Sequence, residues 1–136
     1  MASKKIALIG GAGFIGHNLA MALKREGHEP FIVDGLAVNI FLSFVDSKVK
    51  NHKFYRAILN KRIDLMYENE IEINVQDARN YEALCLVLHK ANPDVIIQLA
   101  AVSHANLSNK NPHATFDHSL RTLENALDFS KPEKSS

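Results

Sequence analysis

Three glycines spaced three residues apart, Gly10, Gly13 and Gly16, constrain this chain more than any other feature. They directly follow the apolar run Ile6-Ala7-Leu8-Ile9, which is typical of a buried parallel strand. After them, apolar residues recur at helical spacing, at Ile15, Leu19, Ala22 and Leu23. A turn without Cβ atoms lets backbone N–H groups approach a ligand closely, and a helix N-terminus attracts anions. The segment therefore predicts a strand-to-helix turn that can hold a pyrophosphate.

Two other interpretations of this segment stay open. Lys4 and Lys5 precede the apolar stretch, and Ala20-Met21-Ala22 resembles the cleavage site of a signal peptide. The glycines, followed by His17 and Asn18, disfavour the continuous apolar helix that a signal peptide needs. A glycine-rich turn with no ligand is the second alternative. Since no run of about 18 apolar residues is present, we predict no membrane span.

The rest of the chain alternates between strand and helix patterns. The first helix is predicted to close at Lys24-Arg25-Glu26, with Gly27 at the C′ position. We predict further strands over 31–34, 71–75 and 94–99, and helices over 78–91 and after the Asn111-Pro112 cap, with the stripe Phe116, Leu120, Leu123 and Leu127. Such alternation implies parallel strands joined by helical crossovers. We therefore expect an α/β domain over 1–129, a doubly wound parallel sheet of about four strands with flanking helices, and a disordered tail over 130–136.

The stretch between Asp34 and Ile71 is longer than a simple crossover. Its first part, 38–45, is strongly apolar, and 50–67 has the pattern of an amphipathic helix whose apolar side holds Tyr55, Ile58, Leu59, Ile63 and Met66. The basic residues Lys48, Lys50, Lys53, Arg56, Lys61 and Arg62 are interpreted as the solvated side of that helix. We favour an insertion and crossover helix over 38–66 that packs on the sheet, because apolar stripes usually face a core. A lid or a partner surface is the alternative.

Asp34 ends the second predicted strand and lies 18 residues after Gly16. An acid about 20 residues beyond such glycines holds the ribose of a dinucleotide by accepting hydrogen bonds from its hydroxyl groups. Its negative charge would repel a 2′-phosphate. The pattern therefore favours NAD over NADP as the cofactor.

Composition and charge exclude several classes of function. The net charge is +1, from 16 basic and 15 acidic residues, which provides no electrostatic footprint for nucleic acid or an anionic membrane. The seven histidines do not cluster in the sequence, so we expect no metal site. The lone Cys85 cannot form an internal disulfide, which fits a cytoplasmic location.

The string Gly10-Gly11-Ala12-Gly13-Phe14-Ile15-Gly16 resembles the extended short-chain dehydrogenase/reductases, which include the NAD-dependent nucleotide-sugar epimerases and dehydratases. The likeness continues through 75–80, 93–101, the loop residues Ser103-His104 and Ser108, and 122–127. It covers nearly the whole chain apart from the insertion. The resemblance implies a Rossmann-type fold with bound NAD.

The resemblance also implies roles for individual residues. Four would line the pyrophosphate: Gly10, Gly13, Phe14 and Ile15. Asp34 would hold the adenosine ribose, Asp77 and Ala78 would flank the adenine, and Leu99, Ala100 and Ala101 would run beneath the cofactor. Alternatively, Asp77 is the N-cap of the 78–91 helix, and residues 99–101 only pack. His104 would face the nicotinamide end or lie on a surface loop.

The departures from the family pattern concern catalysis. The family's catalytic Tyr-x-x-x-Lys is absent, since Tyr55, Tyr67 and Tyr81 are followed four positions later by Leu59, Ile71 and Cys85. Its catalytic Ser or Thr follows a fifth strand, and its members are more than twice as long. Gln98, His118 and Arg121 stand where His, Asn and Gly are common.

We therefore expect the NAD-binding part of a nucleotide-sugar epimerase or dehydratase that acts by transient hydride transfer, inactive by itself and without catalytic residues of its own. The rival hypothesis is a non-catalytic NAD-binding sensor or protein-interaction module. Because the outer edge of the fourth strand would be unpaired, we also expect a homodimer or other self-association through that edge.

Overall fold

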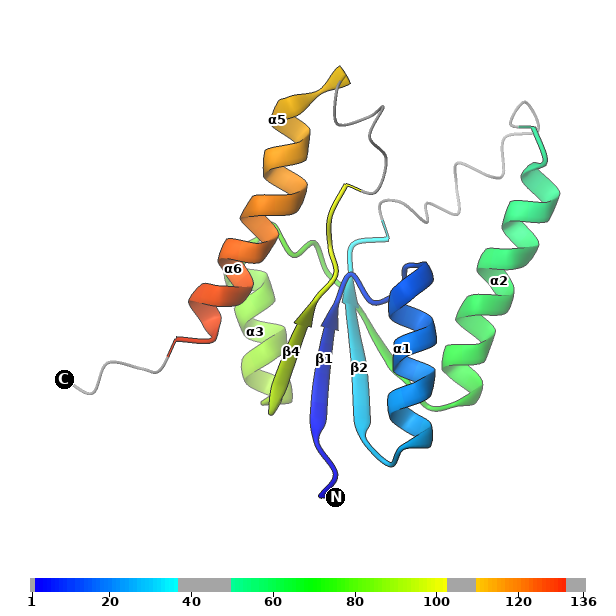
Figure 1. Cartoon of the computed structure of the whole chain (residues 1–136), viewed down its shortest axis with the longest axis horizontal. Helices are drawn as coiled ribbons and strands as arrows, with labels where there is room; N and C mark the ends of the chain where they lie inside the picture. The colour runs from blue at the N-terminus through cyan, green and yellow to red at the C-terminus, as the bar shows by residue number, and fades with distance from the viewer. Residues whose placement is uncertain (1, 37–49, 103–109, 132–136) are drawn as a thin grey trace.

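The computed structural model describes residues 2–36, 50–102 and 110–131, and within them four parallel strands form one sheet (Figure 1). The strands are β1 (Lys5–Ile9), β2 (Glu29–Asp34), β3 (Glu72–Val75) and β4 (Val95–Gln98), arranged in the order β3-β2-β1-β4. Each pairing is parallel, with Ile6 of β1 opposite both Pro30 of β2 and Val95 of β4. The predicted parallel sheet is confirmed.

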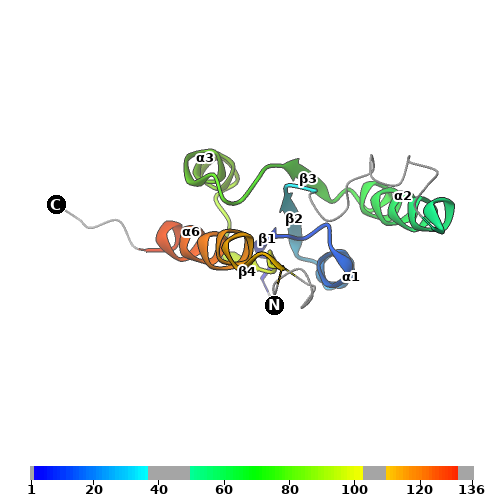
Figure 2. The ribbon, with the colours of Figure 1, turned by 90° about the horizontal axis from the view of Figure 1, so that it is seen from above.

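The helices cover both faces of this sheet, as Figure 2 shows from above. One face carries α1 (Phe14–Arg25) and α2 (His52–Glu68), and the other carries α3 (Tyr81–Ala91) and a helix near the C-terminus. That last helix has three consecutive parts, α5 (Pro112–Thr115), the π-helical η2 (Phe116–Arg121) and α6 (Thr122–Phe129). The doubly wound α/β class is therefore confirmed.

The core lies in two layers, one on each face of the sheet. On the first face, Leu8 and Ile32 pack with Ala20 of α1 and Met66 of α2, and all four side chains are buried. The second layer joins Ala7, Ile9, Phe31 and Val33 to Leu84, Leu88 and Ala126. Because β1 and β2 are interior strands covered on both faces, their sequences are continuously apolar rather than alternating.

Asparagine side chains cap the N-termini of two helices, α3 and α5. The Asn111 side chain accepts a hydrogen bond from the Ala114 N–H at 3.0 Å, and Pro112 follows it, which confirms the predicted cap. α3 begins later than predicted, because the Asn80 side chain caps it by accepting from the Ala83 N–H at 3.1 Å. The alternative in which Asp77 caps this helix is therefore wrong.

One of the apolar stripes used to predict helices faces outward, since the stripe on the last helix is exposed at Phe116, Leu120, Leu123 and Leu127. The positions that this last helix buries are Thr122, Asn125 and Ala126. On α1 only Ile15 of the predicted stripe is exposed, at 67%, whereas Leu19 and Leu23 pack against the core. On α2, Leu59 and Met66 are buried, whereas Tyr55, Ile58 and Ile63 are more exposed. The interpretation that α2 packs on the sheet holds for one narrow face of the helix.

Several predictions fall outside the described residues. They concern the apolar segment 38–45, the loop with Ser103, His104 and Ser108, and most of the tail from 130 onward. None of the helices in the described parts of the chain is long and apolar enough to cross a membrane.

Candidate functional site

A pocket of about 520 Å³ lies at the carboxyl ends of the strands. Small-molecule sites in proteins have volumes of about 300–1,000 Å³, and open parallel sheets bind ligands at this edge. The lining includes every residue that the sequence singled out for a cofactor: Gly10, Gly13, Phe14, Ile15, Asp34, Asp77, Ala78, Leu99, Ala100 and Ala101. The structure thus brings the predicted site residues together, while the role of each stays a prediction.

The glycine turn brings the end of β1 into contact with the end of β4. Gly10 has a φ of +78°, and a Cβ built on it would lie 2.5 Å from the Ala100 nitrogen. A Cβ on Gly16 would lie 2.4 Å from the Gly11 carbonyl oxygen. Only glycine fits at either position without displacing backbone atoms. Gly16 therefore allows α1 to start directly against the glycine turn, which aims its first turn at the pocket.

The N-terminus of α1 is open toward the pocket. Gly13 is its N-cap, and the first turn has no side-chain cap and no acidic residue. A Cβ on Gly13 would meet only the Gly10 carbonyl oxygen, at 3.4 Å, and the next two side chains, Phe14 and Ile15, are exposed. The first N–H groups of a helix have no partner within it and carry the positive end of its dipole. This cradle fits the pyrophosphate of a dinucleotide.

The Asp34 carboxylate is fixed by backbone donors. One oxygen accepts a hydrogen bond from the Ala12 N–H at 3.0 Å, and the other accepts from the Leu36 N–H at 2.7 Å. A carboxylate has about four acceptor positions, so two remain available after these bonds. The group is thus oriented at the pocket wall with capacity to accept ribose hydroxyl groups.

Asp77 is held by an arginine instead. Arg79 Nη2 lies 2.6 Å from one Asp77 oxygen, and Nε donates to both oxygens at 3.0 Å. Arg79 also reaches Asp117 of η2 at 3.0 Å, and Arg121 binds the other Asp117 oxygen at 2.7 Å. Hydrogen bonding by Arg79 lowers the pKa of Asp77, and the same bond raises the pKa of Arg79. This ion-pair network ties the turn after β3 to the C-terminal helix.

Neutral side chains add to this connection. Asn125 of α6 is buried, and its Nδ2 donates to the carbonyl oxygens of Ala78 at 2.8 Å and Arg79 at 3.1 Å. Gln98 Nε2 donates to the Ala100 carbonyl oxygen at 3.0 Å and to Thr122 Oγ1 at 2.7 Å. The C-terminal helix therefore positions two walls of the pocket, the turn after β3 and the end of β4.

The sequence predictions omitted several residues that line the pocket. One of them, Arg62, was predicted to be solvated, and that prediction is wrong. The basic residues of α2 were interpreted as solvated, but Arg62 is half-buried in the pocket wall, and its Nη1 donates to the Ala12 carbonyl oxygen at 3.1 Å. Arg62 lies three residues after Leu59 and four before Met66, so it shares their buried face. That spacing could have placed Arg62 on the buried face of α2, but not in the wall of the pocket. Five further lining residues were not predicted as site residues: Gly16, Val33, Gly35, His118 and Thr122.

In residues 2–36, 50–102 and 110–131, no group of three or more His, Cys, Asp or Glu side chains is placed to hold a metal ion.

Comparison with known proteins identifies relatives over most of the chain. The profile of the NAD dependent epimerase/dehydratase family matches residues 6–134. The UDP-glucose 4-epimerase of Dictyostelium discoideum is 28% identical over 133 residues, which are 96% of this chain and 34% of that protein. Protein CapI of Staphylococcus aureus is 27% identical over 127 residues, 93% of this chain and 34% of CapI. The chain thus spans about a third of the length of these relatives.

A solved structure shares the fold. It is a UDP-glucose-4-epimerase from Stenotrophomonas maltophila with bound NAD and formylated UDP-arabinopyranose, with a TM-score of 0.70 and 22% sequence identity. The likeness covers 93% of this chain and 33% of that one. The four-stranded sheet and its flanking helices therefore match part of an epimerase fold.

Proposed function

The chain belongs to the NAD-dependent epimerase/dehydratase family, and we propose that it binds NAD in the pocket at the carboxyl ends of its strands, as the cofactor-binding part of a nucleotide-sugar epimerase or dehydratase. The observation that carries this proposal is the convergence of the glycine turn, the open α1 N-terminus and Asp34 on one pocket. An anion cradle at a helix N-terminus, followed by an acid at the end of the next strand, is the arrangement that binds the pyrophosphate and the ribose of a dinucleotide.

Each part of the pocket then has a defined task. The α1 N-terminus and the glycine turn bind the pyrophosphate, because their N–H groups and the helix dipole favour negative charge. Asp34 accepts hydrogen bonds from the adenosine ribose. Asp77 and Ala78 flank the adenine, and residues 99–101 support the cofactor from the end of β4. The bound NAD would supply the hydride acceptor of the family reaction.

The isolated chain is proposed to bind the cofactor without turning over a substrate. In the family reaction a Tyr, assisted by a Lys, removes the proton of the substrate hydroxyl as hydride passes to NAD. None of Tyr55, Tyr67 or Tyr81 has a Lys four positions later in these 136 residues. The nucleotide sugar and the epimerase or dehydratase reaction are assigned to the complete enzyme.

Calorimetric titration of the 136-residue chain with NAD tests this proposal. NAD should bind, and Asp34→Asn should weaken binding about tenfold or more, because a charge-assisted hydrogen bond to the ribose is lost. The matched control is Asp64→Asn, which removes the same charge from an exposed position on α2. No binding of NAD, or equal weakening by the two variants, would overturn the assignment.

We also propose that the chain self-associates beside β4. Among the described strands β4 lies at one edge of the sheet, and the neighbouring C-terminal helix exposes the stripe Phe116, Leu120, Leu123 and Leu127. An unpaired strand edge next to apolar surface favours pairing with a second copy. In sedimentation velocity, a dimer should form as concentration rises, and Leu120→Glu with Leu127→Glu should abolish it. Leu86→Glu on α3, a position 73% exposed, is the control and should leave it intact.

A further inference from the structure

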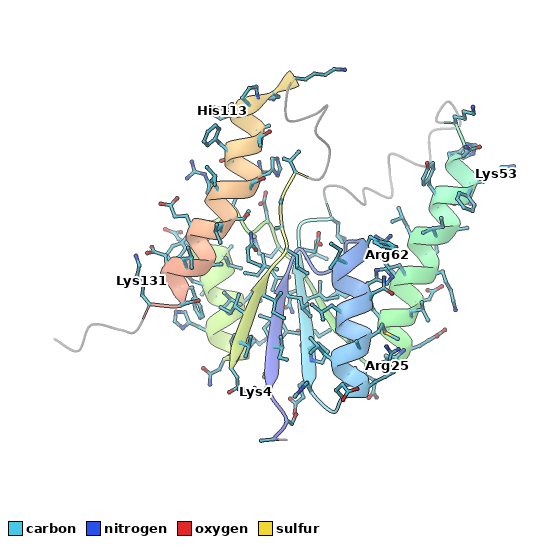
Figure 3. All side chains as sticks on the ribbon, viewed as in Figure 1. Lys4, Arg25, Lys53, Arg62, His113 and Lys131 are labelled. Atoms are coloured by element: carbon cyan, nitrogen blue, oxygen red, sulfur yellow. The ribbon has the colours of Figure 1, made fainter. Side chains whose placement is uncertain are left out.

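Arg62 reaches the glycine turn from α2, although it lies 50 positions after Ala12 in the sequence. Figure 3 places the Arg62 side chain between α1 and α2, near that turn. Its Nη1 donates to the Ala12 carbonyl oxygen at 3.1 Å, and Arg62 also lines the pocket. A side chain of the crossover helix thus contacts the backbone of the turn that is proposed to bind the pyrophosphate.

The backbone of Ala12 is held from two directions. Its N–H donates to one Asp34 oxygen at 3.0 Å, while its carbonyl oxygen accepts from Arg62. Ala12 is buried, at 3% exposure, and belongs to the same apolar cluster as Met66 of α2. The residue that orients the acid is therefore fixed to α2 by a hydrogen bond and by packing.

Arg62 is anchored on the packed face of α2. It lies three residues after Leu59 and four before Met66, which are both buried, whereas the neighbouring Lys61 is exposed. Burial lowers the pKa of Arg62 and the charge of Asp34 opposes that change, but a guanidinium stays protonated at neutral pH. Arg62 and Asp34 therefore attract each other across the turn.

We propose that Arg62 is a positioning residue of the cofactor site, which holds the Ala12 backbone so that the Ala12 N–H keeps Asp34 turned toward the adenosine ribose. The inference rests on the proposed function, because it takes that ribose to lie at Asp34. The hydrogen bond fixes the Ala12 carbonyl oxygen, and the attraction between the two charges draws the carboxylate toward the turn. A ribose hydroxyl then meets an acceptor that is already in place, so less conformational freedom is lost on binding.

The 2′-hydroxyl of the ribose distinguishes this role from general support of the fold. ADP and 2′-deoxy-ADP both carry the adenine and two phosphates, and they differ only in that hydroxyl, which the acid of such a site binds. In calorimetric titrations, the unaltered chain should bind ADP about tenfold more tightly than 2′-deoxy-ADP, because the deoxy compound lacks one charge-assisted hydrogen bond.

Arg62→Met keeps an apolar stem and removes both the charge and the donor. It should weaken ADP binding about fivefold and change 2′-deoxy-ADP binding less than about twofold, which reduces the preference for the hydroxyl to about twofold. Arg62→Lys should keep part of the preference, because it retains the charge but loses the planar fork. Lys61→Met is the matched control, since it removes one charge from the exposed neighbouring position and should leave the preference unchanged.

Asp34→Asn completes the design, because it removes the group through which Arg62 is proposed to act. The effects of two residues that act through one contact are not additive. Once Asp34→Asn is present, Arg62→Met should therefore weaken ADP binding further by less than about twofold. Melting temperatures establish that each variant is folded, and Arg62→Lys supplies the comparison if Arg62→Met does not fold.

Loss of ADP and 2′-deoxy-ADP binding by the same factor in Arg62→Met would overturn the inference, because Arg62 would then support the turn without acting on Asp34. Additive losses in the double variant, or an unaltered chain with no preference for the hydroxyl, would overturn it too. In each of these cases NAD still binds the unaltered chain, and the proposed function stands. Failure of NAD and ADP to bind the unaltered chain would overturn the proposed function and this inference with it.

Discussion

The two acids of the pocket, Asp34 and Asp77, follow neighbouring strands and are held in opposite ways. Asp34 is oriented by two backbone N–H groups, which leave acceptor positions open. Asp77 is engaged through both oxygens by Arg79, which continues to Asp117 of the C-terminal helix. A carboxylate fixed by the backbone can serve a ligand, whereas one fixed by an arginine is largely committed to connecting parts of the fold.

The two sides of the pocket also differ in which parts of the chain hold them in place. The Asp34 side is built from residues close in sequence, the glycine turn and the end of β2. The Asp77 side depends on the C-terminal helix, through Arg79 and Asn125. Substitutions in the glycine turn should therefore damage the pocket most, and substitutions in the ion pairs least.

The largest effect is expected from Gly10→Ala, which would disrupt the glycine turn on the Asp34 side of the pocket. It combines a left-handed backbone with a Cβ 2.5 Å from the Ala100 nitrogen. We expect a loss of about 3 kcal/mol or more in the free energy of unfolding, together with loss of NAD binding. The control is Gly27→Ala, because Gly27 has a similar φ of +83° but open space around it. It should cost about 1 kcal/mol. Urea denaturation measures both, and equal costs would contradict the close approach of β1 and β4.

A smaller effect is expected from Asn125→Ala, which tests the Asp77 side. The change leaves the Ala78 and Arg79 carbonyl oxygens without their buried donor, at a cost of about 2 kcal/mol. NAD binding should weaken as well, because the adenine wall loses its support. Thermal denaturation and NAD titration give the two quantities. Glu124→Ala, at the exposed neighbouring position, should change neither.

Arg79→Met should have a still smaller effect on stability, about 1 kcal/mol or less, because its ion pairs are partly exposed. The loss should shrink further at high salt, which screens such pairs. A comparison of melting temperatures at 0.05 M and about 1 M salt checks this. Arg25→Met, on the exposed end of α1, is the control for removal of one charge. A loss as large as that of Asn125→Ala would contradict this order, because the ion pairs of Arg79 would then contribute as much stability as the buried Asn125.

The smallest expected effect is the change in folding stability that follows the ionisation of Asp77. Because Arg79 lowers its pKa in the folded state, Asp77 contributes stability above the unfolded value of about 3.9, and the contribution is lost as pH falls through the folded value. Asp77→Asn should therefore be less stable than the unaltered chain at pH 7, and the difference should shrink as the pH falls below the unfolded value of about 3.9. Urea midpoints measured across this pH range give the result. A difference that persists at low pH would assign the loss to packing rather than charge.

The part of the site that follows from local sequence was predictable. The glycine spacing, the apolar run before it and an acid at the end of the next strand specify a strand-turn-helix-strand unit that is typical of dinucleotide binding. The pocket indeed contains Gly10, Gly13 and Asp34 together. Periodicity placed the helices but misjudged which face of the last helix is buried, because a stripe of apolar residues does not show whether a neighbouring element covers it.

The amino-acid sequence by itself determined the alternation of strands and helices, the glycine turn and the position of Asp34. Each of these features depends on residues that lie close together in the sequence. Tertiary structure alone decided that Arg62 enters the pocket wall and that Arg79 and Asn125 bind the C-terminal helix to the turn after β3. Those contacts join residues about 40 to 50 positions apart. Their side chains meet only because the crossovers stack α1 with α2 and α3 with α6 on opposite faces of the sheet, and no local pattern encodes that stacking.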